Sequence, residues 1–93
     1  MLLIRNYRSG KCLDADANAL GYSADRVQLW TCNGGANQKW LPIPDNPNVN
    51  NQVILENAAD GKCLDADTNS VNNNGGKVQL WDWWGGVNQI WQG

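Results

Sequence analysis

The residues of this chain best suited to chemistry are aspartates that occur in close pairs. Asp14 and Asp16 form one pair, and Asp65 and Asp67 form the other. The chain contains no histidine, so general acid–base catalysis would have to use two carboxylates, as glycoside hydrolysis does. Neighbouring carboxylates on one strand share an environment, which gives no means of dividing the roles of acid and base between them. We therefore predict no catalytic residues and no enzymatic activity.

The same aspartates begin a pattern similar to the start of a calcium-binding loop. Residues 14–18 and 65–69 both have the spacing Asp-x-Asp-x-Asn. A calcium loop of the EF-hand type needs glycine at its sixth position and glutamate at its twelfth. Those positions hold Ala19 and Asp25 in the first pattern, and Ser70 and Gly76 in the second. The sequence therefore predicts no metal site, and it gives no sign of a cofactor.

A repeat of the whole pattern determines how these residues are placed. Gly10 corresponds to Gly61 and Trp40 to Trp91, and the offset of 51 positions holds between them without insertion. Both copies contain Gly-Lys-Cys-Leu-Asp-Ala-Asp, Val-Gln-Leu-Trp, Gly-Gly and Asn-Gln-x-Trp in that order. Units of such repeats cannot bury their apolar faces alone and pack on copies of themselves. We divide the single domain, residues 1–93, into unit one (1–44) and unit two (45–93).

Short strands joined by tight turns are the elements that the composition favours. With no Phe, six Trp and ten Gly, the chain is unsuited to a helix bundle. We expect strands at 4–7, 11–16, 27–30, 38–41 and 53–57, a loop at 18–25 and a connection at 42–51. Pro42 and Pro44 restrict their segment to the edge of a sheet, because proline donates no ladder hydrogen bond.

The alternation of side chains predicts which face of each strand meets the core. A period of two places Val27 and Leu29 on one face of their strand and Gln28 and Trp30 on the other. If Val27 and Leu29 face the core, Trp30 lies outside it. By the same argument, Leu13 faces the core and Asp14 the opposite side.

The three cysteines allow at most one disulfide within the chain and leave one thiol over. Unit two has Trp83 at the position of Cys32, so Cys63 lacks the partner that Cys12 has. We expect a disulfide between Cys12 and Cys32, which would close a loop of about 20 residues and add roughly 3 kcal/mol of stability. Tryptophan packing would replace it in unit two, and Cys63 would be a small buried apolar residue.

Charge and hydropathy exclude two classes of partner. The seven Lys and Arg residues are scattered and the formal net charge is -2, whereas nucleic-acid binding needs clustered basic residues. No apolar run is long enough to span a bilayer, and Arg5 interrupts the N-terminal apolar run too early for a signal peptide. We expect a soluble chain without a signal peptide, with no nucleic-acid partner and no membrane insertion.

With Cys-Leu-Asp, Val-Gln-Leu-Trp and Asn-Gln-x-Trp in this order, the chain resembles the ricin B-type lectins. This is the β-trefoil family of QxW repeats, which includes many carbohydrate-binding modules of glycosidases. The resemblance covers both units and implies an all-β fold, a β-trefoil, in which three units surround a pseudo-threefold axis. Each unit would supply strands to a six-stranded barrel and a hairpin to its cap. The resemblance, with the expected disulfide, also implies an extracellular protein.

The resemblance assigns sugar-binding roles to five residues of each unit. Asp14 would accept hydrogen bonds from two neighbouring sugar hydroxyls, and Asn37 would donate to one of them. Trp30 would stack under the apolar face of the ring, with Gln28 as a polar contact beside it. Gln38 would orient Asp14 or the turn more than touch sugar. The corresponding residues of unit two are Asp65, Gln79, Trp81, Asn88 and Gln89.

The chemistry of a pyranose agrees with this assignment. One face of the ring carries C–H groups and its rim carries hydroxyls, so a binder needs an aromatic plate edged by polar groups. Such shallow sites bind weakly, and several linked sites would raise the useful affinity. The resemblance favours galactose-type sugars, with xylan or mannose-type ligands as alternatives.

Structural roles compete with these assignments. Trp40 and Trp91 close their units, and we expect both in the core. Trp30 and Trp81 would otherwise pack against another unit, and Asp14 and Asp65 would otherwise be turn residues that bond their own backbone. In unit two, Trp83 and Trp84 would add a second platform or close the pocket. The alternative function is a structural or protein-interaction trefoil, with a contact patch formed by Trp81, Trp83 and Trp84.

Two units do not complete a threefold barrel, so we expect a homo-oligomer. Open edges and apolar faces would otherwise remain. A homotrimer with two trefoils is favoured, since three chains supply six units. Closed symmetry favours an arrangement in which unit one of all three chains forms one trefoil and unit two of all three forms the other. The short connection at 41–52 instead favours an arrangement in which both units of a chain stay together and a neighbouring chain supplies the third unit. A dimer with a remodelled barrel, or a truncated or engineered fragment, is the other possibility.

Overall fold

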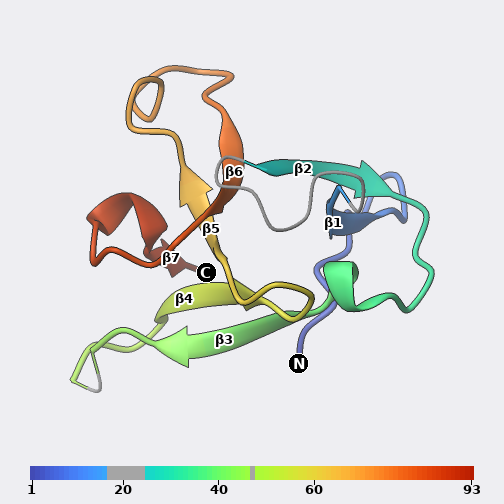
Figure 1. Ribbon diagram of the computed structural model, residues 1–93, viewed down its shortest axis with the longest axis horizontal. Coiled ribbons are helices and arrows are strands. Elements are labelled where there is room, and N and C mark those ends of the chain that lie inside the picture. Colours follow the sequence, from blue (N-terminus) through green and yellow to red (C-terminus); the bar gives the residue numbers. More distant parts are fainter. Residues whose placement is uncertain (17–24, 47) are drawn as a thin grey trace.

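The computed structural model describes residues 1–16, 25–46 and 48–93, and in these residues the chain is all-β as predicted (Figure 1). Its strands are β1 (Cys12–Ala15), β2 (Asp25–Trp30), β3 (Trp40–Pro44), β4 (Gln52–Asn57), β5 (Cys63–Ala66), β6 (Val78–Trp81) and β7 (Trp91–Gln92). Two single-turn 3-10 helices, η1 (Ala36–Gln38) and η2 (Val87–Gln89), precede β3 and β7. Most of the loop predicted at 18–25 lies outside the described residues, and β2 begins at Asp25. None of the helices in the described ranges is long and apolar enough to cross a membrane.

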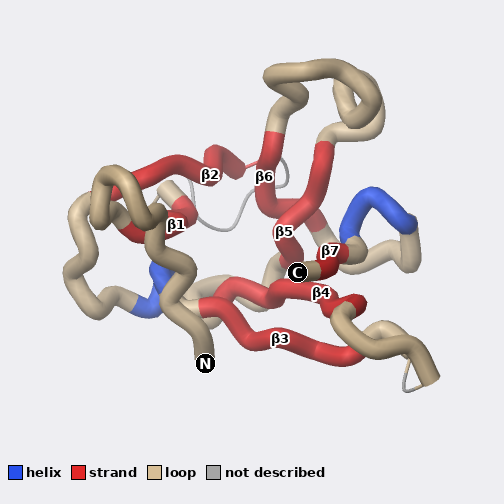
Figure 2. The backbone as a smooth tube through the Cα atoms, turned by 180° about the vertical axis from the view of Figure 1, so that it is seen from behind, coloured by secondary structure: helices blue, strands red, loops and turns tan. Residues whose placement is uncertain are grey.

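The repeat in the sequence is also a repeat in the sheet. All strand pairs are antiparallel, in the order β1-β2-β6-β5-β4-β3, and β7 pairs with β4. The pairs β1–β2 and β5–β6 have the same register, which sets Asp14 opposite Gln28 and Asp65 opposite Gln79. The β3–β4 hairpin lies below these two pairs in Figure 1, and the view from behind shows the same arrangement (Figure 2). Each unit therefore contributes one β-hairpin, one 3-10 turn and one following strand, and unit two also contains β4 before its hairpin.

The core confirms most of the predicted inward residues. Its buried members are Ala15, Trp40, Leu55, Leu64 and Leu80, against which Ile4, Leu13, Val27, Val53 and Trp91 pack while partly buried. The indole N–H of Trp40 donates to the Leu13 carbonyl oxygen at 3.2 Å, and that of Trp91 donates to the Leu64 carbonyl oxygen at 2.9 Å. The tryptophan of each Asn-Gln-x-Trp motif thus ties its own unit together.

Leu29 was predicted to face the core, and this is wrong. Its side chain is 47% exposed, whereas its counterpart in unit two, Leu80, is fully buried. The difference comes from the neighbouring unit, because Leu80 pairs with Asp25 of β2. In the described part of the chain, no strand takes the corresponding place beside Leu29.

The N-terminal segment differs from the predicted strand at 4–7. It forms isolated bridges, Leu2 with Trp40 and Arg5 with Cys12, instead of a continuous strand. Its counterpart β4 pairs with β3 as well as with β5 and β7. Among the described residues the N-terminal segment has no partner that corresponds to β3, so one of its sides is left open.

The predicted strand at 38–41 begins at Trp40. Residues 36–38 instead form the turn η1, in which the Lys39 N–H donates to the Ala36 carbonyl oxygen at 3.1 Å. The strand that follows, β3, ends the sheet order. Pro42 and Pro44 therefore lie in an edge strand, as their missing N–H groups require.

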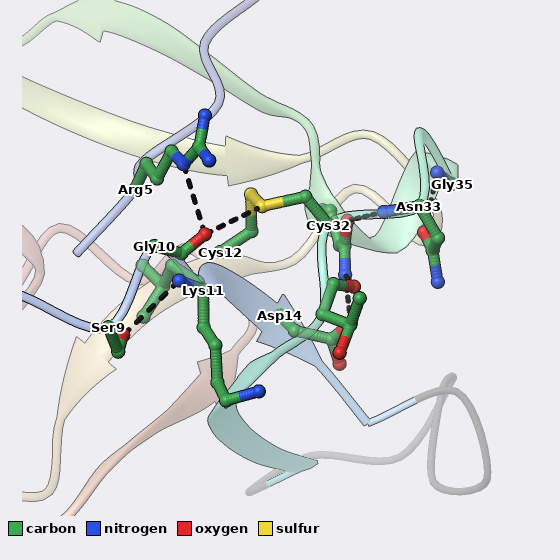
Figure 3. The surroundings of a disulfide bond; sticks show 12 residues. Arg5, Ser9, Gly10, Lys11, Cys12, Asp14, Cys32, Asn33 and Gly35 are labelled. Atoms are coloured by element: carbon green, nitrogen blue, oxygen red, sulfur yellow. Dashed lines mark hydrogen bonds between the residues drawn. A yellow bond between two sulfur atoms is a disulfide. The ribbon is translucent and has the colours of Figure 1, made fainter. Parts of the chain in front are cut away.

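The predicted disulfide joins Cys12 of β1 to Cys32, which follows β2, with an S–S distance of 2.02 Å (Figure 3). The Gly10 carbonyl oxygen beside it accepts a hydrogen bond from Arg5 Nε at 3.0 Å. Unit two has an ion pair near the corresponding place, between Lys62 Nζ and Asp82 Oδ1 at 2.7 Å. A disulfide thus stabilises the hairpin of unit one, and an ion pair stabilises the hairpin of unit two.

Cys63 is a free and buried thiol. Burial raises its pKa to about 11, and the negative charges of Glu56, Asp65, Asp82 and Asp60 add to the rise. Because the pKa in the folded chain lies above that of an unfolded thiol, the contribution of Cys63 to stability is kept below about pH 9 and lost between about pH 9 and 11.

We predict that Cys63 of the native chain reacts with a thiol reagent at pH 8 at least roughly 100-fold more slowly than in the urea-unfolded chain. The thiolate is the reactive form, and a rise of two pKa units lowers its fraction about 100-fold. The measurement is the rate of labelling with an aromatic disulfide reagent, without reductant. Equal rates in native and unfolded samples would show that the thiol is accessible and ionises normally.

Candidate functional site

Each unit has a hollow formed by its hairpin and its 3-10 turn. The hollow of unit one has a volume of about 360 Å³ and is lined by Asp14, Asp16, Arg26, Gln28, Trp30, Asn33 and Asn37. That of unit two has a volume of about 430 Å³ and is lined by Asp65, Asp67, Thr68, Asn69, Lys77, Gln79, Trp81, Trp84 and Asn88. Both volumes lie within the range of about 300–1,000 Å³ that is typical of small-molecule sites. Four of the five residues predicted for each unit therefore line one hollow.

Strand register places the aspartate, the glutamine and the tryptophan of each hollow on one face. Asp14 lies opposite Gln28, and Cys12, two residues before it, lies opposite Trp30. Residues two apart on a strand share a face. The carboxylate and the indole are therefore neighbours, and unit two repeats the arrangement with Asp65 opposite Gln79 and Cys63 opposite Trp81.

Asp14 is only 2% exposed and is held by three amide groups. Its Oδ1 accepts a hydrogen bond from Gln28 Nε2 at 3.2 Å. Its Oδ2 accepts from Asn37 Nδ2 at 3.1 Å and from Gln38 Nε2 at 2.8 Å. A carboxylate offers about four acceptor positions, so Oδ1 has one left for a ligand at the wall of the hollow.

Unit two reproduces this network. Asp65 Oδ1 accepts from Gln79 Nε2 at 3.0 Å, and Asp65 Oδ2 accepts from Asn88 Nδ2 at 3.1 Å and from Gln89 Nε2 at 2.9 Å. Both aspartates thus take part in side-chain networks that join separate elements, which differs from the alternative of a turn residue bonding its own backbone.

Gln38 and Gln89 are fully buried and line neither hollow. Besides its bond to Asp14, Gln38 Nε2 donates to the Thr31 carbonyl oxygen at 2.9 Å, and Gln38 Oε1 accepts from the Asn33 N–H at 2.9 Å. Gln89 makes the same contacts with the Asp82 carbonyl oxygen and the Trp84 N–H, at 2.8 and 3.1 Å. These glutamines position the aspartate and the turn instead of facing a ligand.

Asn37 differs from its expected role as a donor to a ligand. Both protons of its Nδ2 are used within the protein, one by Asp14 Oδ2 and one by the Ala15 carbonyl oxygen at 2.9 Å. Asn88 is bonded in the same way, to Asp65 and to the Ala66 carbonyl oxygen at 3.0 Å. What each asparagine offers to the hollow is its Oδ1, an acceptor.

The tryptophans stand at the edge of the hollows. Trp30 is 55% exposed and Trp81 is 37% exposed, so each indole has a free surface next to a buried carboxylate. This confirms that Trp30 lies outside the core, as the alternation in its strand predicts. An exposed aromatic plate beside fixed polar groups suits a ligand with one apolar face and a polar edge.

Sequence reasoning missed the basic residue that lines each hollow. Arg26 and Lys77 line the two hollows at positions related by the offset of 51. The repeat could have identified them, because a basic residue precedes Val-Gln-Leu-Trp in both units. Asp16 and Asp67, the second members of the two aspartate pairs, also line the hollows.

Trp84 makes the hollow of unit two different. It lines that hollow, and its ring lies so close to Gly86 that a Cβ there would come within 2.1 Å of Trp84 Cζ2. Any larger residue at Gly86 would have to displace the indole. Since the hollow of unit two is the larger one, Trp84 adds a second aromatic wall and does not close the pocket.

A family model described as ricin-type beta-trefoil lectin domain-like matches residues 2–81. The chain belongs to this family. Comparison with curated proteins finds no match.

Three solved structures are similar to this ricin-type lectin-like chain. The designed three-fold symmetric protein ThreeFoil is 28% identical with a TM-score of 0.84, and the match covers 95% of this chain and 59% of ThreeFoil. An exo-beta-1,3-galactanase from Clostridium thermocellum is 30% identical with a TM-score of 0.84, over 97% of this chain and 18% of the galactanase. The hemolytic lectin CEL-III is 26% identical with a TM-score of 0.73, over 97% of this chain and 19% of CEL-III.

These similarities establish the predicted fold as a β-trefoil of which the chain forms a part. The chain spans 59% of ThreeFoil and less than a fifth of the galactanase and of CEL-III. The described residues contain the strands of two QxW units. The fold is thus that of carbohydrate-binding lectin domains, and each hollow lies on one of its units.

We predict that Gln38→Ala lowers the free energy of unfolding by about 2–4 kcal/mol, because it removes three hydrogen bonds and leaves buried groups without their partner. The measurement is urea unfolding followed by tryptophan fluorescence. The matched control is Lys39→Ala, the next residue, whose exposed side chain should change stability by less than about 0.5 kcal/mol. Equal effects of the two substitutions would show that the buried network contributes little.

Proposed function

We propose that this lectin-like domain binds carbohydrate through one shallow pocket in each unit, with galactose-type sugars as the preferred ligands. One observation carries the proposal. In both units a buried aspartate with one unused acceptor position lies beside an exposed indole, at the same strand register. This combination offers an apolar plate and a fixed acceptor side by side, which a pyranose needs.

In the proposed complex the sugar ring stacks on Trp30 or Trp81. One hydroxyl donates to Oδ1 of the aspartate, and a neighbouring hydroxyl donates to Oδ1 of Asn37 or Asn88. Gln28 and Gln79 hold the aspartate and border the ring. Gln38 and Gln89 act through the aspartate, as positioning residues. Arg26 and Lys77 supply donors at the rim, which suits a ligand whose oxygen atoms also accept hydrogen bonds.

Galactose-type sugars suit this arrangement because two of their adjacent ring hydroxyls lie on the same side. Such a pair can donate to two acceptors that stand next to each other, here the oxygens of an aspartate and an asparagine. The opposite face of the ring presents C–H groups to the indole. The similarity to an exo-beta-1,3-galactanase supports the same class of ligand. Xylan and mannose-type ligands are the alternatives that a screen would compare.

We further propose that binding is multivalent and occurs without catalysis, outside the cell. Two pockets on one chain, and more on a homo-oligomer, would raise the avidity for a polymeric glycan. The carboxylates of Asp14 and Asp65 are each engaged by three amide donors, which suits an acceptor for a sugar hydroxyl. The Cys12–Cys32 disulfide is compatible with an oxidising, extracellular setting.

We predict that Trp30→Ala with Trp81→Ala weakens binding of galactose-terminated glycans at least about tenfold, because each pocket loses its stacking surface. The measurements are a glycan array and calorimetric titration with a galactoside. Both indoles are exposed, so their removal should leave the fold intact, which circular dichroism checks.

The matched control is Trp83→Ala, an exposed tryptophan that lines neither hollow, and its binding should stay within about twofold of the parent. Unchanged binding by the double variant would remove both proposed pockets. Loss of a protein partner through Trp83→Ala, without any sugar binding by the parent chain, would instead favour a protein-interaction trefoil built on Trp81, Trp83 and Trp84.

A further inference from the structure

The third residue after each Val-Gln-Leu-Trp motif is Asn33 in unit one and Trp84 in unit two. Both side chains line the hollow of their own unit. The backbone is held in the same way in both units. Gln38 Oε1 accepts from the Asn33 N–H at 2.9 Å, and Gln89 Oε1 accepts from the Trp84 N–H at 3.1 Å. The two hollows thus share a backbone frame at this position and differ in the side chain that it presents.

In unit one the side chain of Asn33 turns back onto its own loop. Its Oδ1 accepts a hydrogen bond from the Gly35 N–H at 2.9 Å. The wall of this hollow at Asn33 is therefore a small polar group with a partner inside the protein. It adds no aromatic surface to that of Trp30.

In unit two Trp84 presents an aromatic ring that is fixed in position. The indole lies against Gly86, where an added Cβ would come within 2.1 Å of Trp84 Cζ2 and 2.4 Å of Trp84 Cη2. The side chain is nevertheless 58% exposed, so most of its surface is not used for packing inside the unit. A surface that is already held in place loses little conformational entropy when a ligand covers it.

The ring of Trp84 lies beside the acceptor that Asn88 offers to the hollow. The same added Cβ at Gly86 would lie 2.4 Å from Asn88 Oδ1, so the indole and this oxygen flank one point. In the proposed complex Asn88 Oδ1 accepts from a sugar hydroxyl, while Trp81 covers the C–H face of the ring. Trp84 is therefore near the hydroxyl edge of the bound sugar. Sugars are linked to one another through these hydroxyl oxygens, so a glycan can continue in this direction.

Packing between units does not cover this position. Unit one contacts unit two through the bond from Asn57 Nδ2 to the Asn37 carbonyl oxygen at 3.0 Å, and Asn33 is exposed beside that contact. Unit two has unit one on its other side, and Trp84 is exposed there as well. The position thus stays open with a neighbouring unit on either side, so its exposure is a property of the unit itself.

We propose that Trp84 forms a second subsite in unit two, so that this unit binds two linked sugar rings of a glycan whereas unit one binds one ring. The first ring occupies Trp81 and Asp65. The second ring places its C–H face on Trp84. Its hydroxyls face polar side chains that line the same hollow, namely Thr68, Asn69 and Lys77. This inference rests on the proposed sugar binding and adds the length of glycan that each pocket recognises.

The test measures the two pockets separately. Trp30→Ala leaves only the pocket of unit two, and Trp81→Ala leaves only that of unit one. Each variant is titrated by calorimetry with methyl β-galactoside and with β-1,3-galactobiose, and the readout is the ratio of the two dissociation constants. We expect the disaccharide to bind at least about tenfold more tightly than the monosaccharide in unit two, and within about twofold of it in unit one.

Reciprocal substitutions then exchange the residue under test. Trp84→Asn, added to Trp30→Ala, should lower the ratio to that of unit one. Asn33→Trp, added to Trp81→Ala, should raise the ratio of unit one at least about threefold, because it supplies the missing ring. The matched control is Trp83→Asn, a neighbouring exposed tryptophan that lines neither hollow, and it should leave the ratio unchanged. Circular dichroism checks that each variant folds.

Equal ratios in the two pockets, an unchanged ratio in Trp84→Asn, or an equal effect of Trp83→Asn would overturn the second subsite while leaving sugar binding intact. Failure of the parent chain to bind either sugar would instead overturn the proposed function, and the second subsite with it. The two failures are therefore distinguishable.

Discussion

A buried carboxylate that accepts three amide hydrogen bonds is the interaction on which each unit depends. An aspartate with so little solvent around it would be strongly destabilising without partners. Asp14 obtains them from Gln28 on the paired strand and from Asn37 and Gln38 on the 3-10 turn. The same bonds that make burial of the charge possible also bring the turn against the hairpin. Structure and candidate site are therefore inseparable here, because one set of contacts builds both.

The two units share this network, but different interactions stabilise their hairpins. Unit one uses a disulfide and unit two uses an exposed ion pair with tryptophans nearby. A surface ion pair contributes about 0–1 kcal/mol, less than the roughly 3 kcal/mol expected for the disulfide. What unit two gains is the second aromatic wall of Trp84. The residues that differ between the units thus lie outside the aspartate network. They lie in the turn that borders the hollow, where the fold accommodates different side chains.

Features internal to one unit could be predicted from the sequence, whereas features shared between units could not. The disulfide follows from the repeat, and the outward direction of Trp30 follows from alternation. The exposure of Leu29 and the incomplete strand near Leu2 depend on which unit lies alongside, which alternation within a strand does not encode. The role of Asn37 depends on which of its atoms the protein itself uses. Residue type alone predicts a donor or an acceptor equally well, and only the bonds to Asp14 and Ala15 decide between them.

The range of the aspartate network along the chain has a kinetic consequence. The bonds from Asp14 to Gln28, Asn37 and Gln38 span 14 to 24 residues, and those from Asp65 span the same distances. Each network closes inside its own unit, so the loop-closure entropy of forming it is that of a short segment. A nascent chain could thus complete the network of its first unit while the second is still being synthesised, and the order of synthesis would become the order of folding.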